Sequence, residues 1–279
     1  IKEIIEDKDI DVVVETMGGT SPAFEFVRDA LLSGKHVTTS NKALVAAHGT
    51  ELLKIAREKN VNFFFEASVG GGIPIIRTLT ESYAGEHFKE ITGILNGTTN
   101  YILTKMDVEG EDFEKALSTA QELGYAERNP EADVEGYDTC RKIAILASLA
   151  TGKEVNFEEI HTEGITKIDT TDFEYAKHMK LSIKLFGDSK FEDGKVFAFV
   201  APVMVERDHP LYMVNDVFNG IMVEGNMLGK SMLYGSGAGK LPTASAVVAD
   251  IVAITKNKDK NVATFGWGCL LYTSDAADD

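Results

Sequence analysis

The sequence predicts an α/β protein in which a partial parallel sheet precedes an α+β domain. Three short runs rich in β-branched or aromatic residues, at 11–15, 35–39 and 61–66, alternate with two helical patterns. The order β-α-β-α-β is typical of a parallel sheet with right-handed crossovers. Beyond them, strand-like runs separated by polar turns over residues 155–225 indicate an antiparallel or mixed sheet.

Each helix of the first part has a local start signal. Ser21-Pro22 fits the N-cap and first position of a helix that ends at Gly34. Ser40-Asn41 fits the cap of a second helix over residues 42–59. Together with the three strands, these helices resemble the second half of a Rossmann-type dinucleotide-binding domain. The usual GxGxxG fingerprint belongs to the first strand-turn-helix unit, which would lie before residue 1.

The second part mixes both kinds of element. A strand is expected over residues 88–95, before the polar run NGTTN at 96–100. The apolar stripe of the segment 112–123 predicts a helix that packs on a core. Further strands are expected at 196–200, 203–206 and 218–223, and Pro242 can open a last helix that continues to Ile254.

Composition narrows the function classes. A formal charge of −16 without a basic cluster argues against nucleic-acid binding. No apolar stretch is long enough to span a bilayer, so no membrane partner is expected. Two cysteines without a CxxC pair, and six scattered histidines, argue against structural zinc and fit a reducing, cytoplasmic setting.

The most informative segment is 120–142, AQELGYAERNPEADVEGYDTCRK. Asp138 and Lys142 are spaced i,i+4 at the start of an apolar helix, so they share one face. Glu127 and Asp133 precede them in a loop constrained by glycine and proline. This set can bind an amine and transfer a proton. The alternative is a solvated helix start with one ordinary ion pair.

Two glycine-rich segments, 66–74 and 233–245, also stand out. Three consecutive glycines at 70–72 allow the backbone to approach a ligand or ion closely, or form a hinge between domains. The second segment runs into the helix after Pro242, where a helix N-terminus favours anions, although a tight hairpin explains the glycines equally well.

Taken together, these segments resemble homoserine dehydrogenases. The segment 120–142 is similar to the family signature A-x3-G-Y-A followed by N-P-x2-D-V-x-G-x-D-x3-K. Four further stretches, in the same order as in the family, also match: VTTSNKALVA, EASVGGGIPII, ILNGTTNYIL and GSGAGKLPTASAVVADI. The similarity covers roughly residues 10 to 256.

The resemblance implies an NADP- or NAD-dependent oxidoreductase that interconverts L-homoserine and L-aspartate 4-semialdehyde, on the way to threonine, methionine and isoleucine. It also implies a homodimer that acts on this small substrate. The implied catalytic residues are Lys142, Lys42 and Asp138, and the implied substrate-binding residues are Glu127, Asp138, Asp133 and Lys42. Cofactor contacts are implied at Thr16, Ser40, Lys42 and Gly239, and the location of Gly18 and Gly19 adds those two. A monovalent cation, Na⁺, is implied at Glu66, Val69, Gly71 and Ile73, mostly through backbone carbonyls.

The expected division is a partial NAD(P)-binding domain at 1–67, a catalytic and dimerisation domain at 68–241, a return helix at 242–265 that packs near the nucleotide domain, and a non-native or disordered tail at 266–279. Two rival interpretations exist. Another two-domain amino-acid or semialdehyde dehydrogenase on the same plan fits the set Glu127, Asp138 and Lys142 less well. A non-catalytic relative does not explain why both Lys42 and Lys142 are present.

Overall fold

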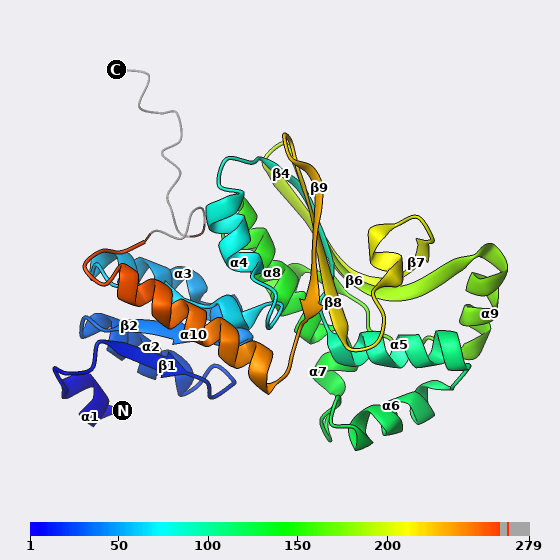
Figure 1. The fold of residues 1–279 in the computed structure, drawn as a ribbon, viewed down its shortest axis with the longest axis horizontal. Coiled ribbons are helices and arrows are strands. Elements are labelled where there is room, and N and C mark those ends of the chain that lie inside the picture. Colours follow the sequence, from blue (N-terminus) through cyan, green and yellow to red (C-terminus); the bar gives the residue numbers. More distant parts are fainter. Residues whose placement is uncertain (263–266, 268–279) are drawn as a thin grey trace.

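The computed structural model describes residues 1–262 and residue 267, and contains two sheets (Figure 1). The first sheet is parallel, in the order β1-β2-β3, and the second has the order β5-β7-β6-β4-β8-β9. The strands of the two sheets are β1 (Val12–Glu15), β2 (His36–Thr39), β3 (Phe63–Phe64), β4 (Phe88–Ile94), β5 (His161–Thr162), β6 (Leu181–Glu192), β7 (Lys195–Glu206), β8 (Phe218–Gly225) and β9 (Gly229–Ser236). The α-helices are α1 (Lys2–Glu6), α2 (Ala23–Leu32), α3 (Lys42–Glu58), α4 (Ile75–Arg77), α5 (Gly97–Glu109), α6 (Phe113–Glu122), α7 (Glu131–Val134), α8 (Tyr137–Thr151), α9 (Thr170–Met179) and α10 (Lys240–Lys256). Short 3₁₀ or π turns are η1 (Glu66–Ser68), η2 (Thr78–Ser82), η3 (Phe157–Glu159) and η4 (Pro210–Met213). The prediction of a partial parallel sheet joined to an α+β domain is confirmed.

The first sheet is packed on both faces. Successive side chains of a strand point to opposite faces, and β2 shows this clearly. Val37 is fully buried in the main hydrophobic core, which includes residues of α2 and α3, whereas Thr38 donates a hydrogen bond to Asp250 of α10. The helix α10 therefore returns to the face of the first sheet opposite the main core, far in sequence from the strands that it covers (Figure 1).

Two element boundaries in this part of the chain, one of a helix and one of a strand, differ from the prediction. The first long helix begins at Ala23 with Pro22 in the cap position and no side-chain cap, so Ser21 is not its N-cap. The third strand is confined to Phe63–Phe64, because the chain enters the 3₁₀ turn η1 at Glu66. The cap predicted at Asn41 is confirmed, since its side-chain oxygen accepts a hydrogen bond from the Leu44 amide at 3.1 Å.

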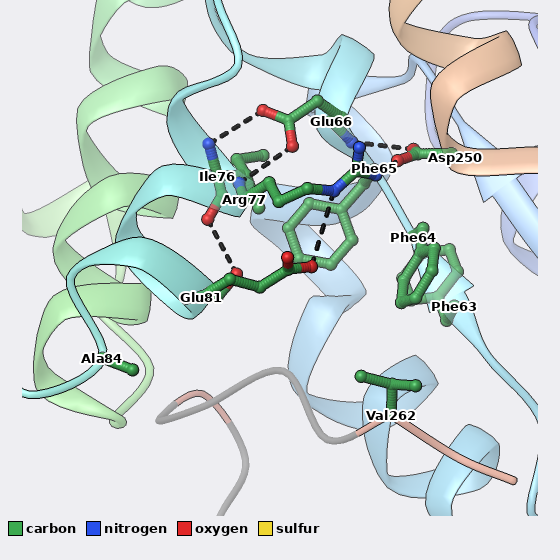
Figure 2. Close-up of a pocket in the computed structure, with 11 residues that line it drawn as sticks. Phe63, Phe64, Phe65, Glu66, Ile76, Arg77, Glu81, Ala84, Asp250 and Val262 are labelled. Carbon is green, nitrogen blue, oxygen red and sulfur yellow. Dashed lines mark hydrogen bonds and ion pairs between the residues drawn. The ribbon is translucent and has the colours of Figure 1, made fainter. Parts of the chain in front are cut away.

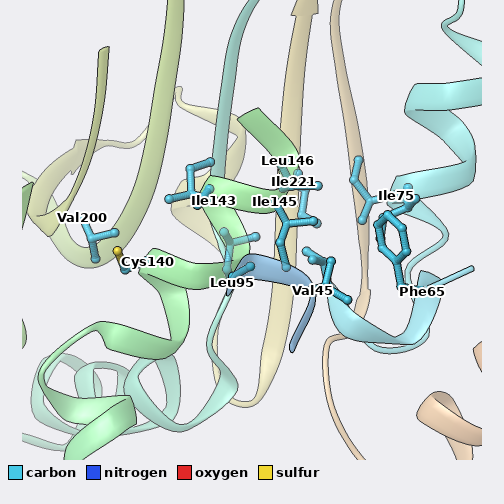
Figure 3. Packing of buried hydrophobic residues seen from close by; sticks show 14 of the residues in the cluster. Val45, Phe65, Ile75, Leu95, Cys140, Ile143, Ile145, Leu146, Val200 and Ile221 are labelled. Carbon is cyan, nitrogen blue, oxygen red and sulfur yellow. The ribbon is translucent and has the colours of Figure 1, made fainter. Parts of the chain in front are cut away.

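Helix α8 lies at the centre of the molecule and joins the two parts through one core. Figure 3 shows Ile145 facing Val45 of α3, and Leu146 beside Ile221 of β8. The helix also packs against β4, β6 and β7 of the second sheet. Because α8 begins at Tyr137, it places Asp138 and Lys142 at the border between the two parts.

The second sheet is antiparallel except where β5 pairs parallel with β7. The two strand runs predicted on either side of Pro202 form one strand, β7. On its outer side β7 pairs with β5 only at Phe199 and Val200, so at Pro202 it is an edge strand, where a proline is tolerated. Strands β6 and β9 and helices α5 and α9 were not predicted at all.

Two further observations concern the described residues. No helix over 1–262 combines the length and apolarity needed to cross a lipid bilayer. Apart from Trp267, the tail predicted at 266–279 lies outside the described residues, as does the last part of the segment 242–265, beyond Val262.

Candidate active site

Asp138 binds two lysines, one through each carboxylate oxygen. Its Oδ2 lies 2.7 Å from Lys142 Nζ and its Oδ1 lies 2.9 Å from Lys42 Nζ. The pair with Lys142 spans one turn of α8, as the i,i+4 spacing predicted. The pair with Lys42 joins α8 to the first turn of α3. Lys142 and Asp138 are almost completely buried, whereas the side chain of Lys42 is 42% exposed.

A network of hydrogen bonds behind Lys42 fixes the start of α3. Glu15, at the end of β1, accepts a bond from Thr39 Oγ1 at 2.6 Å, and Thr39 Oγ1 accepts from the Asn41 amide at 2.9 Å. The side chain of Asn41 donates to the carbonyl of Gly19 at 2.7 Å. These hydrogen bonds thus connect the carboxyl ends of β1 and β2 to the residue that precedes Lys42.

Asn96 is a member of this site that the sequence analysis missed. It follows β4, is 5% exposed, and its Nδ2 lies 2.8 Å from Asp133 Oδ1 and 2.8 Å from Asp138 Oδ2. Its neighbour Leu95 accepts a hydrogen bond from Lys142 Nζ at 2.7 Å through its carbonyl. An asparagine before glycine at the end of a strand was visible in the run NGTTN, but an N-cap alone explains it equally well.

The charges of the site are strongly coupled. Burial by itself raises the pKa of Asp138, but the charges of Lys142 and Lys42 and the hydrogen bond from Asn96 outweigh it and hold this pKa well below its usual range. The negative charge of Asp138 raises the pKa of Lys42. Burial, and then the charge of Asp138, raise the pKa of Asp133. Both Lys42 and Asp138 are therefore charged at neutral pH.

The other predicted substrate residue, Glu127, is exposed in the loop before α7, and the described hydrogen bonds and ion pairs do not link its side chain to Asp138. The structure thus brings Lys42, Asp133, Asp138 and Lys142 together and leaves Glu127 at the surface. The segment that carries Glu127 is held near α5, because Thr98 Oγ1 donates to the Tyr125 carbonyl at 2.6 Å.

The predicted cofactor positions lie at the carboxyl ends of β1 and β2 and at the start of α10. Thr16, Gly18 and Gly19 are exposed, and both glycines have left-handed backbones with φ of +97° and +73°. A Cβ added at either glycine meets no atom within 4 Å, so this loop presents open backbone to a ligand. Ser40 is half-buried at the end of β2, and Gly239 occupies the N-cap of α10.

The predicted cation positions surround a tightly turned loop. Gly70 and Gly71 have φ of +76° and +54°, and a Cβ on Gly71 would lie 2.5 Å from the carbonyl of Gly237. Of the implied carbonyls, that of Ile73 already accepts a hydrogen bond from the Ile75 amide at 2.8 Å. Over residues 1–262 and 267, no group of three or more His, Cys, Asp or Glu side chains is placed to hold a metal.

The carboxylate of Glu66 caps a helix in this structure. It accepts hydrogen bonds from the amides of Ile76 at 2.9 Å and Arg77 at 2.8 Å, and so caps α4 (Figure 2). The Glu66 amide in turn donates to Asp250 of α10 at 3.0 Å, and the Arg77 side chain binds Asp250 at 2.9 Å. Burial raises the pKa of Glu66 to about 7 and that of Asp250 to about 6. This cluster, which sequence reasoning missed beyond Glu66 itself, connects α10 to α4 and β2.

A partial nucleotide-binding sheet joined to a domain that presents lysines and carboxylates at their border defines the class of two-domain dehydrogenases. Comparison with known proteins gives the particular family. A family model described as homoserine dehydrogenase matches residues 74–252, and one described as its NAD binding domain matches residues 1–66. The chain belongs to the homoserine dehydrogenase family.

Relatives and solved structures agree with this assignment. Homoserine dehydrogenase of Bacillus subtilis is 44% identical over 92% of this chain and 59% of the relative, and that of Synechocystis is 46% identical over 94% and 62%. The crystal structure of homoserine dehydrogenase from Thiobacillus denitrificans has a TM-score of 0.88 at 42% identity, over 90% of this chain and 58% of that one. A hyperthermophilic archaeal homoserine dehydrogenase in complex with NADPH has a TM-score of 0.79 at 33% identity, over 91% and 74%. The chain thus spans about 60% of the length of the curated relatives named here.

Proposed function

We propose that the full-length protein interconverts L-homoserine and L-aspartate 4-semialdehyde with NADP or NAD, in the synthesis of threonine, methionine and isoleucine. One observation carries the proposal: Lys142 and Lys42 lie on opposite oxygens of the buried Asp138, at the border between the two parts of the fold. In this proposal a small aldehyde or alcohol lies against these two ammonium groups, and the cofactor lies on the open loop of Gly18 and Gly19.

The ammonium of Lys142 is suited to act on the reacting oxygen. It has three hydrogens, of which one is donated to Asp138 and one to the carbonyl of Leu95. One hydrogen is left, and its direction is fixed because the other two are held. A nicotinamide cofactor supplies the hydride. As charge builds on the aldehyde oxygen, Lys142 stabilises it and delivers a proton.

Lys42 supplies charge, not the proton, in this proposal. Asp138 raises its pKa, so its ammonium stays protonated through the working range. Lys42 begins α3 two residues after Ser40, one of the proposed cofactor positions. A fixed positive charge there stabilises the oxyanion without transferring a proton.

The carboxylates are suited to the amino group of the substrate. Asp133 is half-buried, and only its Oδ1 is engaged by a hydrogen bond among the described residues. Its Oδ2, together with Asp138 and the exposed Glu127, can hold an α-ammonium group. A charged amine bound by carboxylates of this kind distinguishes an amino-acid aldehyde from a plain one.

A homodimer and a monovalent cation belong to the same proposal. The face of the second sheet opposite α8 leaves Phe197 and Tyr234 more than half exposed, which supports pairing across this face. The left-handed Gly70 and Gly71 support a Na⁺ ion held by carbonyls in that loop. Sedimentation of the full-length protein tests the first, and activity in Na⁺-free buffer tests the second.

The deciding experiment is homoserine-dependent reduction of NADP and of NAD by the full-length protein, beside the Lys142→Ala variant. We expect turnover in the wild type and a loss of at least about 10²-fold in the variant, which is the usual contribution of a proton-transferring side chain. A folded wild type that reduces neither cofactor contradicts the proposed reaction. Near-normal kcat in the variant removes Lys142 from the mechanism.

A further inference from the structure

Asn96 makes two separate sets of contacts, one with the backbone and one with the acidic residues. Its Oδ1 accepts a hydrogen bond from the Thr99 amide at 2.8 Å, which caps α5. Because the Thr99 amide can only donate, the oxygen of the Asn96 amide must face the helix. The NH₂ group must therefore face Asp133 and Asp138.

The NH₂ group has two hydrogens, and the two carboxylates take one each, at 2.8 Å in both cases. Asp138 has two lysines as well, whereas no lysine or arginine in the described part of the chain lies within ion-pair distance of Asp133. Asn96 is thus the neutral group that holds two neighbouring carboxylates together. Without it, only the charges of Lys142 and Lys42, neither within ion-pair distance, would favour the charge of Asp133 beside Asp138.

We propose that Asn96 is a positioning residue of the reaction, whose amide holds Asp133 ionised next to Asp138 and leaves Asp133 Oδ2 for the ammonium group of the substrate. This role rests on the proposed function. This role also explains why the run NGTTN begins with asparagine. The cap of α5 alone does not require asparagine, since serine or aspartate would cap the helix equally well. Asn96 touches neither substrate nor cofactor in this proposal and acts through Asp133 and Asp138.

Two substitutions separate the two sets of contacts. Asn96→Ser keeps an oxygen for the cap and removes both N–H donors, and its shorter hydroxyl has a single O–H in their place. Asn96→Asp also keeps the cap but adds a third carboxylate. The matched control is Asn156→Ser, because Asn156 also caps a short helix and donates to one carboxylate, Glu159, at 3.2 Å, but is exposed and has no described hydrogen bond to Asp133 or Asp138.

The first readout is the pH dependence of kcat/KM for homoserine in the full-length protein. We expect the acid limb to move to higher pH by about one unit in Asn96→Ser, and further in Asn96→Asp, because a lost hydrogen bond to a charged group is worth about that much. The KM for homoserine should rise roughly ten- to hundredfold, more than kcat falls. Asn156→Ser should match the wild type.

A second readout needs no turnover. The donors of Asn96 favour ionised Asp133, so Asn96→Ser should lower Tm more at pH 8 than at pH 5, whereas loss of a cap costs the same at both. An active wild type whose Asn96→Ser variant keeps the wild-type pH profile and KM would overturn the positioning role and leave the proposed reaction intact. If the wild type is inactive, an equal loss of Tm at both pH values would overturn the ionisation argument independently.

Discussion

The substitution Asp138→Asn tests the central ion pairs most directly. It keeps the volume of the side chain and removes the charge that holds Lys142 at 2.7 Å and Lys42 at 2.9 Å. Removing one partner of a buried pair leaves the other charge uncompensated, at a cost of about 3–5 kcal/mol. The side chain of Lys142 is only 10% exposed, so most of this cost comes from Lys142. The half-exposed Lys42 adds little, since water screens it.

The assay is urea unfolding of the variant and of the wild type. With an m-value of about 3 kcal/mol/M for a chain of this size, we expect the midpoint to fall by roughly 1–1.7 M. The pKa of Asp138 is lowered in the folded state, so its stabilisation is present above the unfolded value near 3.9 and is lost as the pH falls toward the folded value. The difference between the two proteins should therefore be full at pH 7 and shrink below about pH 4.

A companion variant makes the result decisive. Adding Lys142→Met to Asp138→Asn removes the stranded charge and should recover most of the lost stability. The reasoning is refuted if Asp138→Asn alone unfolds within about 0.5 kcal/mol of the wild type, which is the range of an ordinary surface change. It is also refuted if the double variant is less stable than Asp138→Asn.

Three further changes test other parts of the structure. Burial raises the pKa of Glu66 to about 7, so the stabilisation that its raised pKa gives is present below the ordinary pKa of 4.5 and is lost as the pH rises to about 7. The variant Glu66→Gln should therefore reduce the fall in unfolding free energy between pH 5 and pH 8 by on the order of 2 kcal/mol. An identical pH dependence of the unfolding free energy in the two proteins would contradict this. Gly71→Ala should cost clearly more than Gly110→Ala in thermal unfolding, because both have positive φ but only a Cβ on Gly71 meets backbone, at 2.5 Å from Gly237. Glu127→Ala should raise the KM for homoserine and spare kcat, and an unchanged KM would remove Glu127 from substrate binding.

The first sheet could be predicted from the sequence because each of its elements carries its own signal. The β-branched run before Thr16 and the cap at Asn41 are local features, and the structure contains both elements. The strands β6 and β9 were not predicted because their own sequences lack a clear strand pattern, and pairing with neighbouring strands stabilises them. Strand β6 is the clearest case, since Lys184 and Asp188 are buried within it and break the apolar pattern.

The site was predictable where chemistry follows spacing along one helix, and less so where distant segments meet. Asp138 and Lys142 form an ion pair because they are one turn apart. No spacing in the sequence places Asn96 between Asp133 and Asp138, since its contacts span 37 and 42 residues. The cluster of Arg77 and Asp250 has the same cause, since its members are 173 positions apart in the sequence.

The two ion pairs of Asp138 differ in what anchors them. The pair with Lys142 lies within one turn of a single helix, so a change in the angle between the two sheets leaves its length unaltered. The pair with Lys42 connects α8 to α3, and any such change would lengthen or shorten it. The position of the Lys142 ammonium is therefore set by the geometry of one helix, whereas that of the Lys42 ammonium is set by how α3 packs against α8.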